Sequence, residues 1–326
     1  MKKPKVIITR KLQDRVEKRM RELFNVDLSD AQYPVSRQEL LSAVKQADIL
    51  VPTIGDKIDA SLLSAASSNL KLIANYGAGY DHIDIKTALQ RGIIVTNTPS
   101  VLTTDTADMT MALILAIPRK LREGHEEMQS GNWKGWSPSA MIGMRITGKK
   151  LGILGMGRIG QAIAKRAKAF DLDINYHNRR RLHENIEKNL SAKYWENLEK
   201  MLATIDILVV SASLNPSSLY LLDAKHLGKM KTSAYLVNIS RGEIIDQKFL
   251  VRQLKDGKLG GAGLDVYDSE EIIGSDFKSL KNVFLLPHMG SSTLEGRIEM
   301  GEKVIINIKT YLDGHRPPDQ IVPSML

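Results

Sequence analysis

Short apolar runs alternate along the whole chain with stretches whose apolar positions recur at helical spacing. The runs that predict strands are Lys5–Thr9, Asp48–Val51, Lys71–Ala74, Ile93–Val95, Lys150–Leu154, Leu172–His177, Asp206–Val210, Ala234–Ile239, Gly261–Val266 and Val283–Leu286. Helical spacing is found at Lys11–Phe24, Ala60–Ala66, Asp84–Arg91 and Ile159–Phe170. Apolar strands separated by helices are typical of a parallel sheet that is covered on both faces.

Two longer helical patterns suggest how the chain divides into domains. Thr103–Leu121 predicts one long helix, and a polar loop at Gly131–Pro138 follows it before the alternation restarts. The last pattern, Ser291–Tyr311, is expected to return to the first domain. We therefore expect an α/β fold of two doubly wound, parallel-sheet, Rossmann-like domains with an active-site cleft between them. One domain should comprise residues 1–100 and 288–326, and the other residues 101–287.

Composition narrows the class of protein. The 326 residues exceed one ordinary core, and 43% hydrophobic and 25% charged residues are typical of a globular protein. No signal peptide is evident, and the longest apolar run, Met109–Pro118, is far below the ~20 residues that span a bilayer. The absence of cysteine excludes disulfides, thiolate catalysis and cysteine metal sites, and no metal is expected. We expect a cytoplasmic protein without membrane contact.

The net charge of +9 raises the question of a nucleic-acid partner. Its basic residues are scattered and interleaved with acids, so we expect no nucleic-acid binding. The excess is either a basic surface or, in part, a means of attracting an anionic cofactor and substrate.

A dinucleotide motif lies between a predicted strand and a predicted helix. Leu151–Leu154 is followed by Gly155-Met-Gly157-Arg-Ile-Gly160, and Arg158 and Ile159 open the helix. The first glycine permits a tight turn, the second lets the backbone approach a pyrophosphate, and the third lets helix and strand pack closely. The helix N-terminus then offers N–H groups to phosphates. The alternative is a plain βα turn.

The next strand indicates which dinucleotide is preferred. An acid that binds the adenine ribose is expected near Asn178, but His177-Asn-Arg-Arg-Arg181 stands there. Guanidinium groups bind a 2′-phosphate, whereas a carboxylate repels it. We predict that NADP(H) is preferred and NAD(H) possible, with Arg179 and Arg180 as the main contacts. The alternative is a solvated basic turn.

Three segments place chemically active residues after predicted strands, where open α/β sheets bind ligands. Arg241 follows Leu236–Ser240 and is suited to grip a carboxylate or carbonyl oxygen. Gly261–Val266 leads into a run of acids. His288 follows a strand and a proline, and is either a structural or a proton-donating histidine.

Taken together, the motifs identify a family. Asn75-Tyr-Gly-Ala-Gly-Tyr-Asp-His-Ile-Asp84, Gly155–Gly160, Val237-Asn-Ile-Ser-Arg-Gly242, Gly263-Leu-Asp-Val266 and Pro287-His-Met-Gly-Ser291 occur in the order seen in the D-isomer-specific 2-hydroxyacid dehydrogenases. The chain resembles this family over essentially its whole length. It is most similar to the glyoxylate/hydroxypyruvate reductase subgroup through Gly131–Trp136, the Asn178–Arg181 turn and Asp313–Pro318.

The resemblance implies roles for individual residues. His288 is the expected general acid in keto acid reduction, Glu270 orients it, and Arg241 orients and polarises the substrate. The substrate site implied by the resemblance comprises Ile54, the backbone around Tyr76, Gly77 and Ala78, Arg241, His288, and Trp136 from the partner subunit of a homodimer. The implied cofactor contacts beyond the glycine motif and the basic turn are Thr104, Ile239, Asp265 and Gly290. Simple interface packing is the alternative role for Trp136.

The chain departs from the family's pattern at one position, and two alternative functions are also considered. The family usually has Glu-x-Glu-Pro where this chain has Asp268-Ser-Glu-Glu271, so Glu271 competes with Glu270 for the role of the acid. A 2-ketogluconate or phenylpyruvate-type reductase would use the same residues with a different pocket. A dinucleotide-sensing, co-repressor-like binding protein would belong to a different functional class, but it would not need the Arg241, Glu270 and His288 set.

Overall fold

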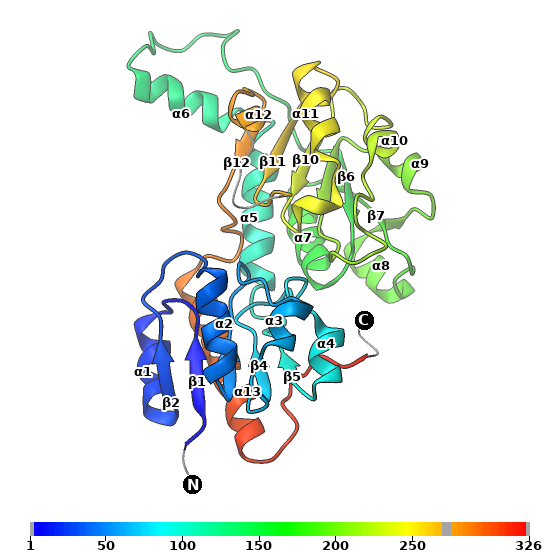
Figure 1. Ribbon diagram of the computed structural model, residues 1–326. Coiled ribbons are helices and arrows are strands. Elements are labelled where there is room, and N and C mark those ends of the chain that lie inside the picture. The colour runs from blue at the N-terminus through cyan, green and yellow to red at the C-terminus, as the bar shows by residue number, and fades with distance from the viewer. Residues whose placement is uncertain (1–2, 269–274, 324–326) are drawn as a thin grey trace. The chain divides into compact units, whose positions relative to one another are not determined.

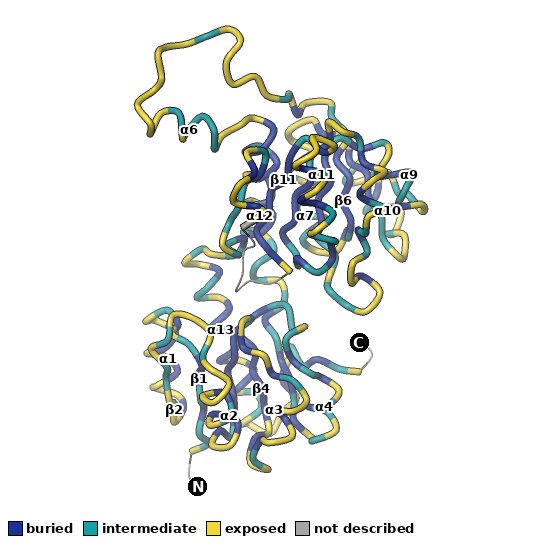
Figure 2. Tube along the Cα trace, turned by 45° about the horizontal axis from the view of Figure 1, so that its top comes forward, coloured by how far each residue is buried: buried dark blue, intermediate teal, exposed yellow. Residues whose placement is uncertain are grey.

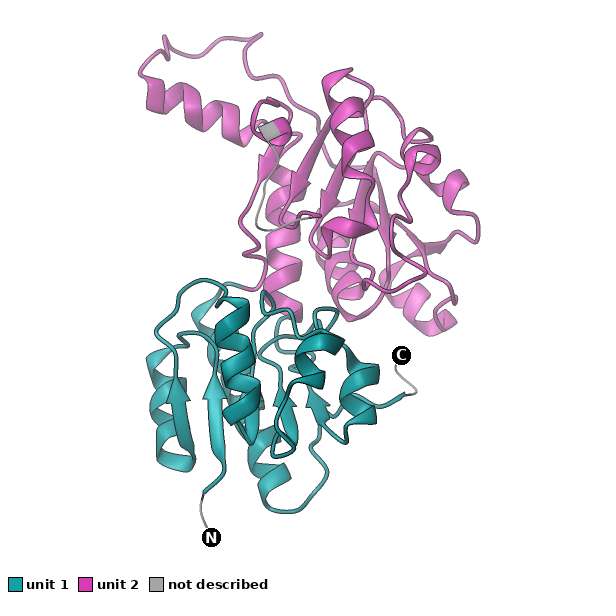
Figure 3. Cartoon of the chain, in the orientation of Figure 1, with its two compact units in different colours: residues 1–102, 292–326 teal, residues 103–291 magenta. Residues whose placement is uncertain are grey.

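The computed structural model describes residues 3–268 and 275–323 (Figure 1). The chain divides into two compact units (Figure 3). Unit 1 comprises residues 1–102 and 292–326, and unit 2 comprises residues 103–291. The division falls close to the expected one, but residues 101 and 102 belong with unit 1, and residues 288–291, which include His288, belong with unit 2.

Unit 1 is built on a five-stranded parallel sheet. Its strands, in spatial order, are β2 (Asn25–Leu28), β1 (Lys5–Ile8), β3 (Ile49–Val51), β4 (Leu72–Ala74) and β5 (Ile94–Thr96). The helices α1 (Asp14–Leu23) and α13 (Leu294–Leu312) pack on one face. The helices α2 (Arg37–Gln46), α3 (Ala60–Ser64) and α4 (Ile85–Gln90) pack on the other. The inner strands β3 and β4 are fully buried, which explains their continuous apolar sequences.

Unit 2 has the same design with seven parallel strands. Their spatial order is β12 (Val283–Leu285), β11 (Gly261–Leu264), β10 (Tyr235–Asn238), β9 (Ile207–Val210), β6 (Lys150–Leu154), β7 (Asp173–His177) and β8 (Lys193–Tyr194). The helices α5 (Thr103–Ala116) and α7 (Arg158–Ala169) cover one face. The helices α9 (Leu198–Leu202), α10 (Ala224–Leu227) and α11 (Gln247–Lys255) cover the other. The short elements α8 (Glu184–Leu190), η1 (Gly242–Ile244) and α12 (Ser275–Lys278) complete the unit.

The order of the strands places the ligand-binding edge of each unit. In unit 2 the chain builds β6, β7 and β8 in one direction and then returns to β9 beside β6. In unit 1 the corresponding reversal lies between β1 and β3. Loops that follow the strands at such a reversal leave a crevice at the carboxyl edge of a doubly wound sheet. The doubly wound, parallel-sheet fold expected from the sequence is confirmed in both units.

One expected helix is two helices in the structure. The pattern Thr103–Leu121 predicts a single helix, but α5 ends at Ala116, and α6 spans Leu121–Ser130. Pro118 follows the end of α5, and Lys120 has a left-handed φ of +55°, so the backbone turns before α6 begins. We name residues 121–145 the arm. Figure 2 shows it extending from unit 2, and none of its residues, all of which are described, is buried.

Candidate active site

The glycine-rich turn connects β6 to α7 at the carboxyl edge of the unit 2 sheet. Gly155 has a φ of +97°, and a Cβ there would lie 2.5 Å from the backbone nitrogen of Ala212. A Cβ on Gly160 would lie 2.4 Å from the carbonyl oxygen of Gly155. A Cβ on Gly157, in contrast, would meet no atom within 4 Å. Gly155 and Gly160 therefore allow close packing, whereas Gly157 leaves open space for a ligand, as the motif predicts.

The first turn of α7 offers backbone donors to an anion. Gly157 is the N-cap and provides no side-chain hydrogen bond, and the first turn contains no acid. None of the described residues accepts a hydrogen bond from the N–H groups of Gly157, Arg158 and Ile159. Free N–H groups and the partial positive charge of the helix N-terminus bind phosphates. The turn therefore fits the pyrophosphate of a dinucleotide.

Two polar side chains hold this turn in place. Asn178 Oδ1 accepts a hydrogen bond from Met156 N–H at 2.7 Å, and Ser211 Oγ donates to the carbonyl oxygen of Gly155 at 2.6 Å. Asn178 was expected among the cofactor contacts, and its side-chain oxygen is engaged by the turn itself. Ser211 was not predicted. The available signal was its position directly after β9, the strand that lies beside β6.

The three consecutive arginines after β7 have different environments. Arg181 donates to Glu187 from Nε to Oε1 at 2.9 Å and to Oε2 at 3.2 Å, and from Nη2 to Oε2 at 2.7 Å. Arg181, with a further hydrogen bond from Tyr176, lowers the pKa of Glu187 to about 2, so this carboxylate stays charged. Arg179 and Arg180 are exposed, and neither pairs with any residue in the described part of the chain. They remain available for an anionic ligand.

Arg241 follows β10 in a turn that is held by its neighbours. Asn238, whose side chain is fully buried, donates from Nδ2 to the carbonyl oxygen of Arg241 at 2.8 Å. Its Oδ1 accepts from Ser240 N–H at 3.1 Å. Gly242 packs so closely on the next segment that a Cβ there would lie 1.9 Å from the carbonyl carbon of Tyr267. The turn that carries Arg241 is therefore fixed against the segment after β11.

His288 lies in a turn after β12 and has a left-handed φ of +56°. The two residues that follow it donate their N–H groups to Asp265, from Met289 to Oδ1 and from Gly290 to Oδ2, each at 2.7 Å. On the preceding side, the Tyr267 hydroxyl donates to the carbonyl oxygen of Leu286 at 2.8 Å. Burial raises the pKa of Tyr267 to about 12, so this donor keeps its proton at neutral pH.

These residues meet at one edge of one sheet. Arg241, Asp265 and His288 follow the strands β10, β11 and β12, which are neighbours and parallel. The carboxyl ends of parallel strands lie along the same edge, so the guanidinium, carboxylate and imidazole groups come from adjacent positions. The proposed acid Glu270 and its competitor Glu271 both lie outside the described residues, so the choice between them stays a prediction.

Unit 1 has a loop with free backbone donors after β4. Asn75 Nδ2 donates to the carbonyl oxygens of Gly77 at 3.1 Å and Gly79 at 2.8 Å, and Asn97 Nδ2 donates to that of Ala78 at 2.7 Å. No acceptor within residues 3–268 and 275–323 pairs with the N–H groups of Gly77 and Ala78. With its carbonyl oxygens engaged, the loop presents donors suited to a carboxylate.

Tyr76 differs from its two neighbours in this loop. Its N–H group donates to the carbonyl oxygen of Pro52 at 2.9 Å. Its buried side chain donates from the hydroxyl to the carbonyl oxygen of Arg297 at 2.5 Å. The expectation that its backbone N–H takes part in carboxylate binding is wrong, because that N–H already closes the junction between the loops after β3 and β4.

The loop that carries Ile54 is organised by a buried carboxylate. Asp56 Oδ2 accepts from Thr53 N–H at 2.7 Å and from the Thr9 hydroxyl at 2.6 Å. An ion pair adds Arg10, whose Nη2 lies 3.7 Å from Asp56 Oδ1. Ile54 itself is half-buried. Asp56 and Arg10 were not predicted, because the hydrogen bond and the ion pair that join Asp56 to Thr9 and Arg10 connect distant parts of the chain.

The remaining predicted contacts lie in unit 2. Thr104 is exposed in the first turn of α5, and Ile239 is buried directly after β10. Gly290 is buried beside the same helix, since a Cβ on it would lie 3.7 Å from Thr106 Cγ2. Trp136 lies in the arm and is 85% exposed. The first three therefore lie near the carboxyl edge of the sheet, whereas the side chain of Trp136 is exposed on the arm.

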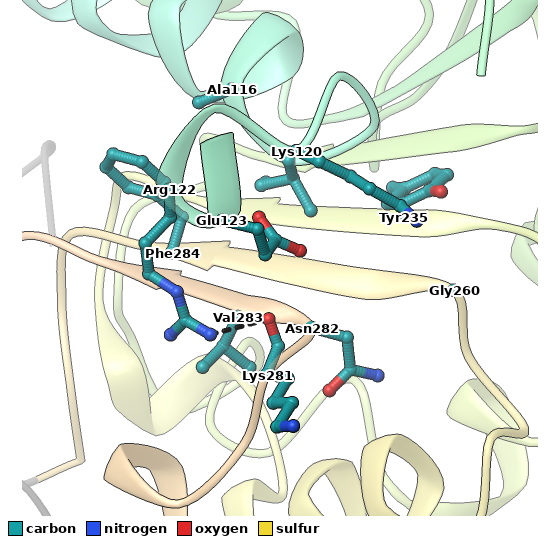
Figure 4. A pocket seen from close by; sticks show the side chains of 11 residues that line it. Ala116, Lys120, Arg122, Glu123, Tyr235, Gly260, Lys281, Asn282, Val283 and Phe284 are labelled. Carbon is teal, nitrogen blue, oxygen red and sulfur yellow. Dashed lines mark hydrogen bonds between the residues drawn. The ribbon is translucent and has the colours of Figure 1, made fainter. Parts of the chain in front are cut away.

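A small pocket in unit 2 lies at the opposite edge of the sheet (Figure 4). Tyr235 and Val283, which line it, are the first residues of β10 and β12. Arg122 joins it to the arm by donating to the carbonyl oxygen of Lys281 at 2.6 Å. The pocket is therefore separate from the strand ends that carry Arg241 and His288. In the described part of the chain, no helix is long and apolar enough to span a bilayer.

A glycine-rich anion site on a doubly wound sheet, beside an arginine and a histidine on nearby strand ends, defines a dinucleotide-binding α/β protein. The sequence model of the D-isomer specific 2-hydroxyacid dehydrogenase, NAD binding domain, matches residues 111–290. The chain is 42% identical to glyoxylate reductase from Thermococcus onnurineus, over 99% of this chain and 97% of that protein. The chain therefore belongs to the D-isomer-specific 2-hydroxyacid dehydrogenase family.

Solved structures agree with this assignment. A glyoxylate reductase from Paecilomyes thermophila superposes with a TM-score of 0.88 at 30% identity, over 100% of both chains. An NADPH-dependent glyoxylate/hydroxypyruvate reductase from Sinorhizobium meliloti, in complex with NADP and malonate, gives a TM-score of 0.85 at 31% identity, over 98% of this chain and 97% of that chain. The family and the fold expected from the sequence are both confirmed.

Proposed function

We propose that this protein reduces glyoxylate and related small 2-keto acids, such as hydroxypyruvate, to D-2-hydroxy acids with NADPH. The observation that carries the proposal is the placement of Arg241 and His288 on either side of Asp265, at the carboxyl edge of a dinucleotide-binding sheet. The Thermococcus relative is a glyoxylate reductase and the Sinorhizobium relative is a glyoxylate/hydroxypyruvate reductase, which supports the substrate class.

The residues divide the work of keto acid reduction. A bound nicotinamide supplies the hydride. His288 donates a proton to the former carbonyl oxygen, and the carboxylate of Glu270 orients that imidazole. Arg241 orients and polarises the substrate through charge-assisted hydrogen bonds. The free N–H groups of Gly77 and Ala78 take the substrate carboxylate, and Ile54 lies beside it.

An initial-rate panel tests the proposed function. We would cross glyoxylate, hydroxypyruvate, pyruvate and 2-ketogluconate with NADPH and NADH. We expect the highest kcat/KM with glyoxylate or hydroxypyruvate and NADPH, and D-glycerate as the product from hydroxypyruvate. Preference for 2-ketogluconate would move the protein to the alternative reductase class. Tight NADPH binding without turnover of any keto acid would favour the dinucleotide-sensing alternative.

We assign the preference for NADPH to Arg179 and Arg180, which are exposed and pair with none of the residues that the structure describes. We expect the double variant Arg179→Ala with Arg180→Ala to lower the kcat/KM for NADPH about 10²-fold while the value for NADH changes little, because each lost charge-assisted hydrogen bond costs roughly 1.5–3 kcal/mol. Steady-state kinetics with both cofactors measure the ratio. Arg181→Ala is the matched control, since its guanidinium is held by Glu187 and its loss should leave the ratio unchanged.

We further propose that the protein is a homodimer formed through the arm. Its exposed large apolar side chains are Leu121, Met128, Trp133, Trp136, Met141 and Ile142. Such a concentration of apolar surface is typical of a protein interface. Light scattering after size exclusion should therefore give twice the 36.3 kDa chain mass.

The role of Trp136 is then separable from simple packing. If it enters the partner's substrate pocket, Trp136→Ala raises the KM for the keto acid about tenfold, the cost of roughly 1.4 kcal/mol of lost contact, while the dimer persists. Trp133→Ala, in the same loop, should leave this KM unchanged. A Trp136→Ala protein that dissociates but keeps its KM when dimeric would assign the residue to interface packing.

A further inference from the structure

We propose that Asp265 is a positioning residue for the proton donor: its carboxylate clamps the turn that carries His288. The inference rests on the proposed function only for the role of His288, and the clamp itself is a property of unit 2. The resemblance assigns Asp265 to the cofactor, and the geometry points to this additional task within the protein.

The clamp consists of a buried carboxylate with two backbone donors. Asp265 is 1% exposed, and its two oxygens accept separately from Met289 and Gly290 N–H at 2.7 Å. A buried charge is stable only when it is paired or hydrogen-bonded, and hydrogen bonds to an ionised acceptor are stronger than neutral ones. Because the donors are consecutive, the carboxylate fixes the peptide planes directly after His288.

The backbone of His288 needs such support. Its φ of +56° is in the left-handed region, which residues with a Cβ adopt at a cost unless the surrounding structure holds them there. Gly290 adds a steric requirement, since a Cβ on it would lie 2.9 Å from Asp265 Oδ2. On the other side of His288, Leu286 is held by the Tyr267 hydroxyl. The turn is therefore pinned both before and after the histidine, by two residues of one segment.

Hydrogen bonds through Asn238 also connect Asp265 to the turn that carries Arg241. Asp265 N–H donates to the carbonyl oxygen of Asn238 at 3.0 Å, and the side chain of Asn238 holds the carbonyl oxygen of Arg241. Gly242 lies against the backbone of Tyr267 and Asp268. The segment after β11 thus supports the two neighbouring turns. A displacement of about 1 Å of a catalytic group lowers a rate about 10²-fold, so this support matters for turnover.

Hydrogen exchange of the protein without cofactor or substrate tests the clamp directly. In the wild type, we expect the amides of Met289 and Gly290 to exchange at least tenfold more slowly than the free amides of Gly77 and Ala78, as resolved by fragmentation of the corresponding peptides in mass spectrometry. In Asp265→Asn, where an amide NH₂ replaces one acceptor, protection of the two residues should fall at least tenfold. Asp268→Asn, an exposed acid on the same segment, is the control and should change neither rate.

Kinetics then connect the clamp to His288. Asp265→Asn should lower kcat about 10²-fold and raise the primary isotope effect from cofactor deuterated at C4, while the dissociation constant for NADPH changes less than threefold. A loss of folded protein would lower kcat without changing the isotope effect. A rise of more than tenfold in the dissociation constant, with Met289 and Gly290 still protected in Asp265→Asn, would overturn the positioning role in favour of cofactor contact alone.

Hydrogen exchange of the wild type tests the clamp even if Asp265→Asn does not fold. Rapid exchange of Met289 and Gly290 in the wild type would overturn the clamp and leave the proposed function untouched. Conversely, absence of keto acid turnover by a wild type with protected amides would overturn the proposed function and leave the clamp in place.

Discussion

His288→Gln is expected to lower kcat for glyoxylate reduction about 10²–10⁴-fold, the usual contribution of a general acid or base. Glutamine keeps a hydrogen-bond donor at the position but has no proton to transfer near neutral pH. Because the substitution does not remove the Asp265 hydrogen bonds to Met289 and Gly290, the turn should keep its backbone. NADPH binding, measured by the fluorescence of the reduced cofactor, should change little, so the loss appears in kcat.

The matched control is another histidine of unit 2 with an acidic neighbour. His226 Nδ1 lies 2.8 Å from Asp223 Oδ1 at the start of α10, a helix that carries none of the proposed site residues. His226→Gln should keep wild-type turnover. If His288→Gln retains more than about a tenth of the wild-type kcat, which is less than 1.4 kcal/mol of barrier, the assignment of His288 as the proton donor is wrong.

The strands were the part of the fold most accessible to sequence reasoning. Strands such as β9 and β6 are buried on both faces, so they appear as unbroken apolar runs and need no knowledge of their partners. The helical segments between them then require parallel pairing. Strands with less burial gave no such signal: β2 alternates exposed and half-buried residues at the edge of its sheet, and β8 has only two residues.

Two helices, α2 and α6, were not predicted from the sequence, for different reasons. The helix α2 was missed although Ser36 and Glu39 form a capping box at its start, which is a readable signal. The arm helix α6 buries none of its residues and has few apolar positions, so its pattern merges with the end of α5. A helix without an apolar face against its own unit offers nothing for periodicity to detect.

The candidate site also contains residues that could be predicted from the sequence and residues that could not. Arg241 and His288 were accessible because each follows an apolar strand, and strand ends are where such folds bind ligands. The side chains that hold them, above all Asn238 and Asp265, act through contacts in space. Ser211 illustrates the limit, since it holds Gly155 from 56 residues away along the chain. A local pattern can mark Ser211 as a residue at a strand end, but it does not show which turn its side chain holds.

The three arginines after β7 show that residue type alone does not identify the side chains that are available to bind a phosphate. The sequence presents Arg179, Arg180 and Arg181 as equivalent, but Arg181 is neutralised by Glu187, a pairing that depends on how α8 folds back towards β7. The free positive charge available to a phosphate is therefore smaller than the sequence suggests. It is nevertheless concentrated on the two residues that were predicted to bind it.

Arg241→Ala is expected to lower kcat/KM for glyoxylate about 10²–10³-fold. Removing one partner of a desolvated, hydrogen-bonded charge pair costs roughly 2–5 kcal/mol, and each 1.4 kcal/mol is a factor of ten. Arg241→Lys should restore only part of the loss, because an ammonium group lacks the planar, two-pronged donor geometry of the guanidinium. Since the arginine both binds and polarises the keto acid, KM should rise and kcat should fall together.

The backbone geometry predicts that these variants fold. The carbonyl oxygen of Arg241 accepts the hydrogen bond from Asn238, and Gly242 provides the packing against Tyr267, so both remain when the side chain and its hydrogen bond to the carbonyl oxygen of Ser240 are lost. Arg252→Ala on α11, an exposed arginine of the same unit whose guanidinium lies 5.3 Å from the ring of Phe249, is the matched control and should leave kcat/KM unchanged. If Arg241→Ala keeps kcat/KM within threefold of the wild type, the arginine has no role in the chemistry, because the loss of a group that polarises the substrate should lower kcat/KM far more.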